Sequence, residues 1–202
     1  MSRGKFITLE GIDGAGKSTH VRGIADFLRG KGKKVVVTRE PGGTPLGEQL
    51  RAVLLSQAMN IDTETLLMFA ARREHIAQVI APGLAEGRWV VSDRFTDATY
   101  AYQGSGGGMA KDRIAALERW VQAGLKPDLT LVFDVPVEVA LARLSKERAD
   151  RFESENRGYF ERVRAGYLER AAAEPSRVRV IDGERSVKEV KTLVENIVTT
   201  IC

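Results

Sequence analysis

A glycine-rich stretch, residues 11–19, holds the combination of residues in this chain that is best suited to chemistry. It reads G-I-D-G-A-G-K-S-T, and the pattern G-x-x-x-x-G-K-[ST] is matched by Gly11, Gly16, Lys17 and Ser18. Glycine lets backbone N–H groups wrap closely around a phosphate, because a Cβ atom would block the approach. The lysine supplies a cation for the outer phosphates, and the hydroxyl can bind Mg²⁺. We therefore expect a nucleoside triphosphate here, with Mg²⁺ as cofactor.

This loop needs a strand before it and a helix after it. Residues 5–10 read as a buried strand, and residues 17–29 read as a helix. The start of such a helix points the positive end of its dipole at the bound anion. A glycine-rich turn without a ligand is the alternative, and the strand–loop–helix context argues against it.

Short apolar runs rich in β-branched residues recur along the chain, separated by segments of helical period. Such runs are typical of parallel strands that are buried on both faces. They lie at residues 6–9, 35–38, 89–92, 129–135 and 178–181. A last helix follows a capping box of Ser186 and Glu189, and its predicted apolar face carries Val187, Val190, Val194, Ile197 and Ile201. No repeat or linker divides residues 1–202, so the sequence predicts a single α/β domain.

The composition limits the classes of partner. A net charge of +4 could suggest nucleic acid, but a phosphate-binding pocket explains the same excess. Since no dense basic run is interleaved with aromatic residues, we expect no nucleic-acid partner. No apolar run is long enough to cross a membrane, so we expect no membrane contact. The single cysteine, Cys202, can form no internal disulfide, which fits a cytoplasmic location.

Charged residues also follow two other predicted strands. Arg39 and Glu40 come after the second strand, in a T-R-E-P-G-G-T stretch where Pro41 forces a loop. Asp93 and Arg94 come after the third strand. Ligands of open α/β sheets bind at this edge. An acid there is the expected Mg²⁺ partner, and an arginine can clamp a phosphate. For T-R-E-P-G-G-T, a surface turn with incidental charges is the alternative.

A long helix is predicted over about residues 63–86. One apolar stripe is expected to carry Leu66, Phe69, Ala70, Ala77, Ile80 and Leu84. Arg73 falls on this stripe one turn after Phe69, and Arg72 lies beside it. An arginine at such a margin often buries only its stem, so a surface role stays open for both. His75 has no paired carboxylate or cysteine in the sequence, so we expect a structural or surface histidine.

Taken in order, these stretches resemble bacterial thymidylate kinases. The resemblance rests on G-I-D-G-A-G-K-S-T, T-R-E-P-G-G-T, D-R-F-x-x-A-T-Y-A-Y-Q-G, P-D-L-T-L-V-F-D and D-R-F-E, and it covers about residues 4–181. The first stretch is shared by many NTPases, whereas the second and third are much more specific. The resemblance implies ATP-dependent phosphorylation of dTMP to dTDP, with Mg²⁺, by a homodimer. It also implies a three-layer P-loop NTPase fold, in which helices flank a five-stranded parallel sheet and a short lid spans about residues 143–156.

The resemblance also implies a role for each matching residue. ATP would be bound by Gly11, Ile12, Asp13, Gly14, Ala15, Gly16, Lys17, Ser18, Thr19 and Arg143. The nucleotide dTMP would be bound by Asp13, Glu40, Pro41, Phe69, Arg72, Arg73, Arg94, Thr99, Tyr102 and Gln103. Catalytic groups would be Asp13, Lys17, Arg39, Arg94 and Arg148. Mg²⁺ would be held by Ser18 and Asp93.

Two of these implied roles involve a choice between neighbours. Phe69 would stack on thymine, and Arg72 would bond its carbonyl, with Arg73 as the alternative. In many relatives the aromatic lies four residues before the arginine, and this chain has Met68 there. Tyr102 would crowd the sugar 2′ position and so disfavour ribonucleotides.

The lid would supply a cation that the phosphate-binding loop lacks. Asp13-Gly14-Ala15 contains no basic residue where some relatives carry one, so the charge on the moving phosphoryl group must be neutralised from elsewhere. We expect Arg148 to do this, helped by Arg143 and Arg151. A solvated charge cluster is the alternative.

Two other functions compete with this one. A GTPase switch would need an N-K-x-D motif, and the chain has no Asn-Lys pair. A kinase for another small acceptor is excluded less firmly by the sequence.

Overall fold

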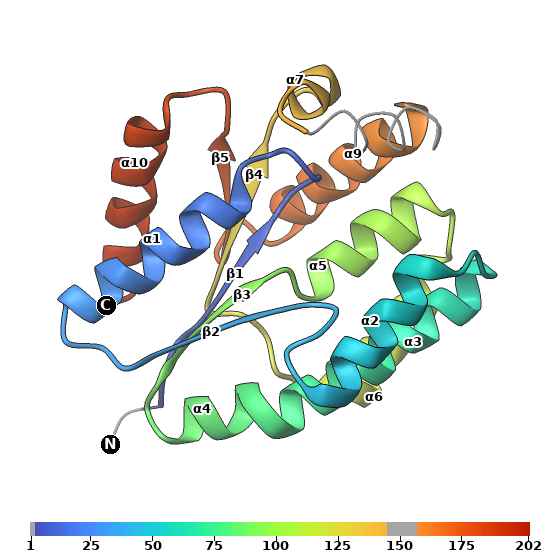
Figure 1. The fold of residues 1–202 in the computed structure, drawn as a ribbon, viewed down its shortest axis with the longest axis horizontal. Coiled ribbons are helices and arrows are strands. Elements are labelled where there is room, and N and C mark those ends of the chain that lie inside the picture. Colours follow the sequence, from blue (N-terminus) through green and yellow to red (C-terminus); the bar gives the residue numbers. More distant parts are fainter. Residues whose placement is uncertain (1–2, 145–156) are drawn as a thin grey trace.

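The computed structural model describes residues 3–144 and 157–202 (Figure 1). Its sheet is parallel, with the strand order β2-β3-β1-β4-β5. The strands are β1 (Phe6–Glu10), β2 (Val35–Arg39), β3 (Trp89–Asp93), β4 (Leu129–Asp134) and β5 (Val178–Asp182). All five strands predicted from the apolar runs are confirmed, and each boundary agrees to within one residue.

Helices cover both faces of the sheet and complete three layers. They are α1 (Lys17–Gly30), α2 (Pro45–Ser56), α3 (Ile61–His75), α4 (Ala81–Ala85), α5 (Thr96–Thr99), α6 (Lys111–Gln122), α7 (Val137–Ala142), α9 (Arg157–Ala173) and α10 (Val187–Thr199). Two π-helical segments, η1 (Ile76–Ile80) and η2 (Tyr100–Gly106), continue α3 and α5. Among these described helices, none has the length and apolar character needed to cross a membrane.

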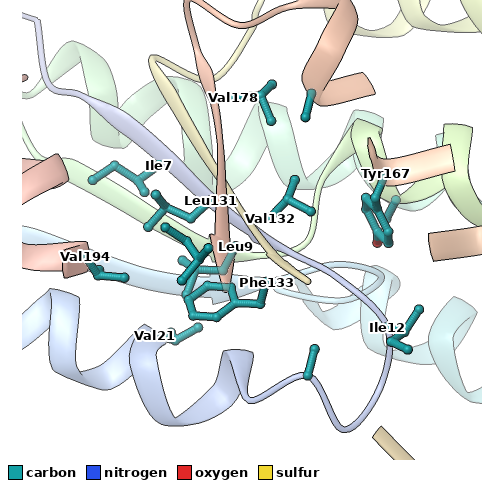
Figure 2. Close-up of a cluster of buried hydrophobic side chains, with 14 of the residues drawn as sticks. Ile7, Leu9, Ile12, Val21, Leu131, Val132, Phe133, Tyr167, Val178 and Val194 are labelled. Carbon is teal, nitrogen blue, oxygen red and sulfur yellow. The ribbon is translucent and has the colours of Figure 1, made fainter. Parts of the chain in front are cut away.

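Alternate positions along the strands divide the core into two layers. On one face, Leu9, Leu131 and Phe133 pack with Val21 of α1 and Val194 of α10, as Figure 2 shows. The other face carries a second apolar cluster beneath η1 and α4. The central strands β1, β3 and β4 are buried and read as nearly continuous apolar runs, whereas the edge strands β2 and β5 are partly exposed.

For the long helix predicted over residues 63–86, the residues on the buried side differ in part from those that were expected. Leu66, Ala70 and Ala77 of the expected stripe are exposed, whereas Phe69 and Ile80 are buried. The segment is three pieces, and its middle piece, η1, is π-helical. The π-turn changes the helical phase only after His75. Leu66 and Ala70 lie before it in α3, whose buried side carries Thr65, Phe69 and Arg72 instead.

The last helix agrees with its predicted start. Ser186 accepts a hydrogen bond from the Glu189 N–H group, and Glu189 accepts one from Ser186, which confirms the capping box. Val190 and Val194 are buried as expected. Val187 is exposed instead of buried, and Val198, which was not expected on the apolar face, is buried.

Candidate functional site

Glycine is required in the loop between β1 and α1. Gly11 has a φ of +133°, and a Cβ atom there would lie 2.4 Å from the Phe133 carbonyl oxygen. Gly16 has a φ of +98° immediately before α1 begins at Lys17. Residues other than glycine rarely adopt these positive φ values. The loop therefore presents its N–H groups and the start of α1 to one place, as an anion site requires.

Lys17 is buried inside this loop. Its Nζ donates hydrogen bonds of 2.8 Å to the carbonyl oxygens of Gly11 and Ile12, and it lies 3.9 Å from Asp13 Oδ1. Burial, together with the nearby charge of Arg94, lowers the pKa of Lys17 to about 8, although the surrounding carboxylates act in the opposite direction. A desolvated ammonium held by carbonyl groups is ready to exchange them for the oxygens of a phosphate chain.

Arg94 lies in a strained turn after β3. Its φ is +73°, which is uncommon for a residue other than glycine and is often found at functional sites. Its Nη2 donates to Asp13 Oδ1 at 2.7 Å and to Tyr102 Oη at 2.8 Å. The guanidinium carbon lies 4.5 Å from the centre of the Tyr102 ring. Three predicted site residues are thus brought together.

Glu10, which the sequence did not single out, holds this turn from below. Its Oε1 accepts a hydrogen bond of 2.7 Å from the Phe95 N–H group, and the Tyr167 hydroxyl donates to its Oε2 at 3.1 Å. Burial, together with the nearby Asp97 carboxylate, raises the pKa of Glu10 to about 8. The buried carboxyl is therefore largely protonated at neutral pH.

The loop after β2 is tied to α2. Arg39 pairs with Glu48 at 2.8 Å, and Glu48 also accepts from the Gly43 N–H group. Arg51 donates to the Pro41 carbonyl oxygen at 3.0 Å. Arg51 was missed in the sequence, because nothing in the helical pattern of α2 marks it. Both arginines face the same cavity.

A buried charge network joins this loop to α3. Glu40 accepts hydrogen bonds of 2.8 Å from Arg72 Nε and from His75 Nδ1. The other ring nitrogen of His75 lies 2.6 Å from Thr38 Oγ1. The expectation that His75 lacks a paired carboxylate is wrong, because its partner lies 35 residues away in the chain. Its expected structural role fits complete burial.

The structure separates the two candidate arginines. Arg73 is exposed, whereas Arg72 is 2% exposed, so the placement of Arg73 on the buried stripe is wrong. Arg72 packs over the Phe69 ring at 4.7 Å, and its Nη2 donates to Thr99 Oγ1 at 3.0 Å. Its Nη1 is buried and has no hydrogen-bond partner among the described residues.

Phe69 and Thr99, which the resemblance places in the dTMP site, are not among the residues that line the cavity. Both contact Arg72, which does not line it either: Phe69 packs against its guanidinium, and Thr99 Oγ1 accepts a hydrogen bond from it. Met68, at the position where many relatives carry the stacking aromatic, does line the cavity. The physical reason is helix phase, since consecutive residues are turned by about 100° around the axis.

The cavity has a volume of about 1110 Å³. It lies along the carboxyl ends of the strands, and its lining includes residues of α10, such as Val187 and Val190, and of α2 and α3, such as Arg51 and Glu64. This is large for a single small ligand, so it has room for two nucleotides. The lining includes Asp13, Gly14, Ala15, Gly16, Lys17, Ser18, Thr19, Arg39, Glu40, Pro41, Arg51, Glu64, Met68, Asp93, Arg94, Tyr102, Gln103, Arg143, Gly183 and Arg185.

Two of these residues suit a magnesium ion. Ser18 is exposed to the cavity at the start of α1, and Asp93 faces it from the end of β3. Asp93 Oδ1 is buried and has no hydrogen-bond partner in the described part of the chain. A hydroxyl and an unpaired carboxylate oxygen are ligands that Mg²⁺ prefers.

Part of the predicted lid can be placed. Arg143, at the end of α7, donates to the Gly183 carbonyl oxygen at 2.8 Å and lines the cavity. Arg148 and Arg151, with most of the segment 143–156, lie outside the described residues.

Comparisons with known proteins all point to one family. The family model described as thymidylate kinase matches residues 9–194. A thymidylate kinase of Cupriavidus metallidurans is 63% identical over 200 residues, covering 98% of this chain and 100% of the relative. One of Nitrosomonas europaea is 62% identical, covering 98% and 94%. The crystal structure of thymidylate kinase from Ehrlichia chaffeensis has 34% identity and a TM-score of 0.81, covering 98% and 99%. The chain therefore belongs to the thymidylate kinase family, whose members use ATP to phosphorylate dTMP to dTDP.

Proposed function

We propose that this chain carries out that reaction inside the cavity described above, with Mg²⁺ as cofactor. One observation carries the proposal. The carboxyl ends of the parallel strands carry the phosphate-binding loop, Arg39, Asp93 and Arg94. All of them line the same cavity. Phosphoryl transfer asks a protein mainly for positioning and for neutralisation of charge, and this cluster offers both.

On the donor side, the loop N–H groups and Lys17 would hold the phosphates of ATP. The side chains of Ser18 and Thr19 face the same space, and Arg143 faces it from the end of α7. If bound, Mg²⁺ would be held by Ser18 and Asp93 and would neutralise charge on the phosphate oxygens.

On the acceptor side, Arg94 and Arg39 would hold the phosphate of dTMP near the transfer path, with Asp13 close to the sugar. Arg72 would donate its unpaired Nη1 to a carbonyl of thymine. Met68 and Pro41 offer apolar surface for the base, while Glu40 fixes Arg72. Tyr102 would narrow the space beside the sugar 2′ position.

A substrate panel tests the proposed reaction. ADP formation would be measured with ATP, Mg²⁺ and one of dTMP, dUMP, dCMP, dAMP or dGMP. We expect dTMP to have the highest kcat/KM, with purine nucleotides at least about a hundredfold lower, because they leave buried polar groups unpaired. Equal efficiency with dTMP and dGMP would contradict the proposal.

A substitution in the loop tests the phosphate site. Lys17→Ala should fold normally and lower kcat/KM by on the order of 10³, because a preorganised cation near the transferred group is lost. Lys191→Ala is the matched control, since Lys191 is exposed on α10. Near-normal turnover in folded Lys17→Ala protein would overturn the assignment of this loop.

Two further features belong to this proposal. A homodimer is supported by large apolar side chains that are exposed on neighbouring helices, namely Leu46 on α2, Leu66 on α3 and Trp120 on α6. A cytoplasmic location is supported by the single cysteine, which allows no internal disulfide.

A further inference from the structure

Gln103 is held by Glu64 at the edge of the cavity. Its Nε2 donates a hydrogen bond of 2.7 Å to Glu64 Oε1. Gln103 is only 2% exposed, and its Oε1 has no hydrogen-bond partner among the described residues. Both side chains line the cavity, although they come from different elements, η2 and α3.

The carboxylate decides which way the amide points. An ionised Glu64 can only accept hydrogen bonds, so the group that faces it must be the NH₂ of Gln103. The amide oxygen is then left on the other side of the same planar group. Without this partner the amide could turn by 180°, because its donor and acceptor have nearly the same shape.

Two buried side-chain atoms near this pair have no hydrogen-bond partner among the described residues: an acceptor on a residue that lines the cavity, and a donor on a residue behind that lining. The acceptor is Gln103 Oε1, and the donor is Arg72 Nη1. The two residues lie near each other in the fold. Thr99 Oγ1 accepts a hydrogen bond from Arg72 Nη2, and Thr99 lies one helical turn before Gln103. A carbonyl next to an N–H group, as at C4 and N3 of a pyrimidine imide, would satisfy both.

We propose that Glu64 is a positioning residue that orients Gln103 and thereby selects bases that carry an N3–H group. The inference rests on the proposed function, since it concerns the same cavity and the same acceptor. Thymine and uracil carry the N3–H donor. Cytosine has a lone pair at N3, which meets the amide oxygen as one acceptor against another.

Glu64→Ala tests this inference through selectivity. Freed from its partner, the Gln103 amide can present either face. We expect kcat/KM for dTMP to fall about tenfold through a higher KM, with kcat nearly unchanged. For dCMP, kcat/KM should stay the same or rise, so the dTMP-to-dCMP ratio falls at least about tenfold. Glu64→Gln keeps an acceptor and should lose less. Equal losses for the two nucleotides, or an unchanged ratio, would overturn the inference.

A double-mutant cycle separates positioning from direct contact. If Glu64 acts through Gln103, Glu64→Ala should change kcat/KM for dTMP less than twofold in a Gln103→Ala background. An equal effect in both backgrounds would contradict this. Glu74→Ala is the matched control on α3, because its carboxylate pairs with Gln78 instead. If the wild-type chain uses dCMP as efficiently as dTMP, the proposed function itself is contradicted. The selectivity of the variants is therefore compared with that of the wild type, which keeps the two tests distinct.

Discussion

Glu10 shows how one side chain fastens three elements beneath the phosphate-binding loop. It ends β1, accepts a hydrogen bond from the turn after β3 and receives another from Tyr167 of α9. The charged groups that act on it are Asp97 and Arg94. Burial removes water from the carboxyl group and so favours its neutral form. The free energy of unfolding therefore depends on pH.

Glu10→Gln should remove that sensitivity. The pKa of Glu10 is raised from 4.5 to about 8 in the folded chain. Between these values the folded state holds a proton that the unfolded state has lost, so the free energy of unfolding falls as pH rises toward 8. Glutamine stays neutral and keeps a similar shape. Between pH 5 and pH 8, wild type should lose at least about 1 kcal/mol relative to Glu10→Gln in denaturant titrations.

The opposite outcome for this variant is clear. If the stability difference between wild type and Glu10→Gln is the same at pH 5 and pH 8, Glu10 is ionised in the folded chain throughout. The buried network would then have to stabilise a carboxylate, chiefly through Arg94.

For single residues, the sequence predicted the positions at which the function depends on backbone conformation. The glycine pattern predicted the loop around Lys17, because close approach to a phosphate leaves few alternatives. Side-chain partners were not predictable in this way. The pairing of His75 and Arg72 with Glu40 joins residues more than 30 positions apart, and no local period reports it.

Among the elements, the strands were predictable and one helix phase was not. The central strands are buried along most of their length and are apolar at most positions, so the apolar runs in the sequence locate them. The segment from α3 to α4 depends on a π-turn, which sequence periodicity does not show. Arg72 and Arg73 are oriented before this turn, within α3, whose buried side carries Phe69 and Arg72.

A buried ionic network joins helix α9 to α5 and to the segment just before β5. Asp97 accepts hydrogen bonds of 2.8 Å from Arg170 Nε and from Arg177 Nη1, and Glu174 pairs with both arginines. The Asp97 side chain is 2% exposed. A buried charge of this kind is costly to leave without its partner.

Asp97→Asn should therefore destabilise the chain. The substitution keeps the volume but leaves two guanidinium groups facing a neutral amide, so we expect a loss of about 3 kcal/mol in the free energy of unfolding. Asp26→Asn is the control, because its pair with Arg29 is exposed and screened by water. The network would be dispensable if both variants unfolded at the same denaturant concentration.

At the level of the whole molecule, parallel topology predicts the edge at which the site forms, but not its full lining. Arg39 and Asp93 follow strands, so their meeting could be expected. Arg51 and Glu64 come from helices α2 and α3, and their approach depends on how those helices pack. Of these two, Glu64 is the residue proposed here to set the specificity for the base.

The face built by α2, α3 and α6 gives the last prediction. Trp120 is 80% exposed on α6 and Leu66 is 55% exposed on α3, and such apolar side chains on neighbouring helices suit a self-complementary dimer contact. Trp120→Asp should weaken self-association at least about tenfold in sedimentation equilibrium, because a buried aromatic anchor is replaced by a charge. The thermal midpoint of the monomer should change little, since the side chain has few contacts within one chain. Val180→Asp, on the edge strand β5, is the control and should still dimerise. Equal association of Trp120→Asp and wild type would place the dimer contact elsewhere or exclude it.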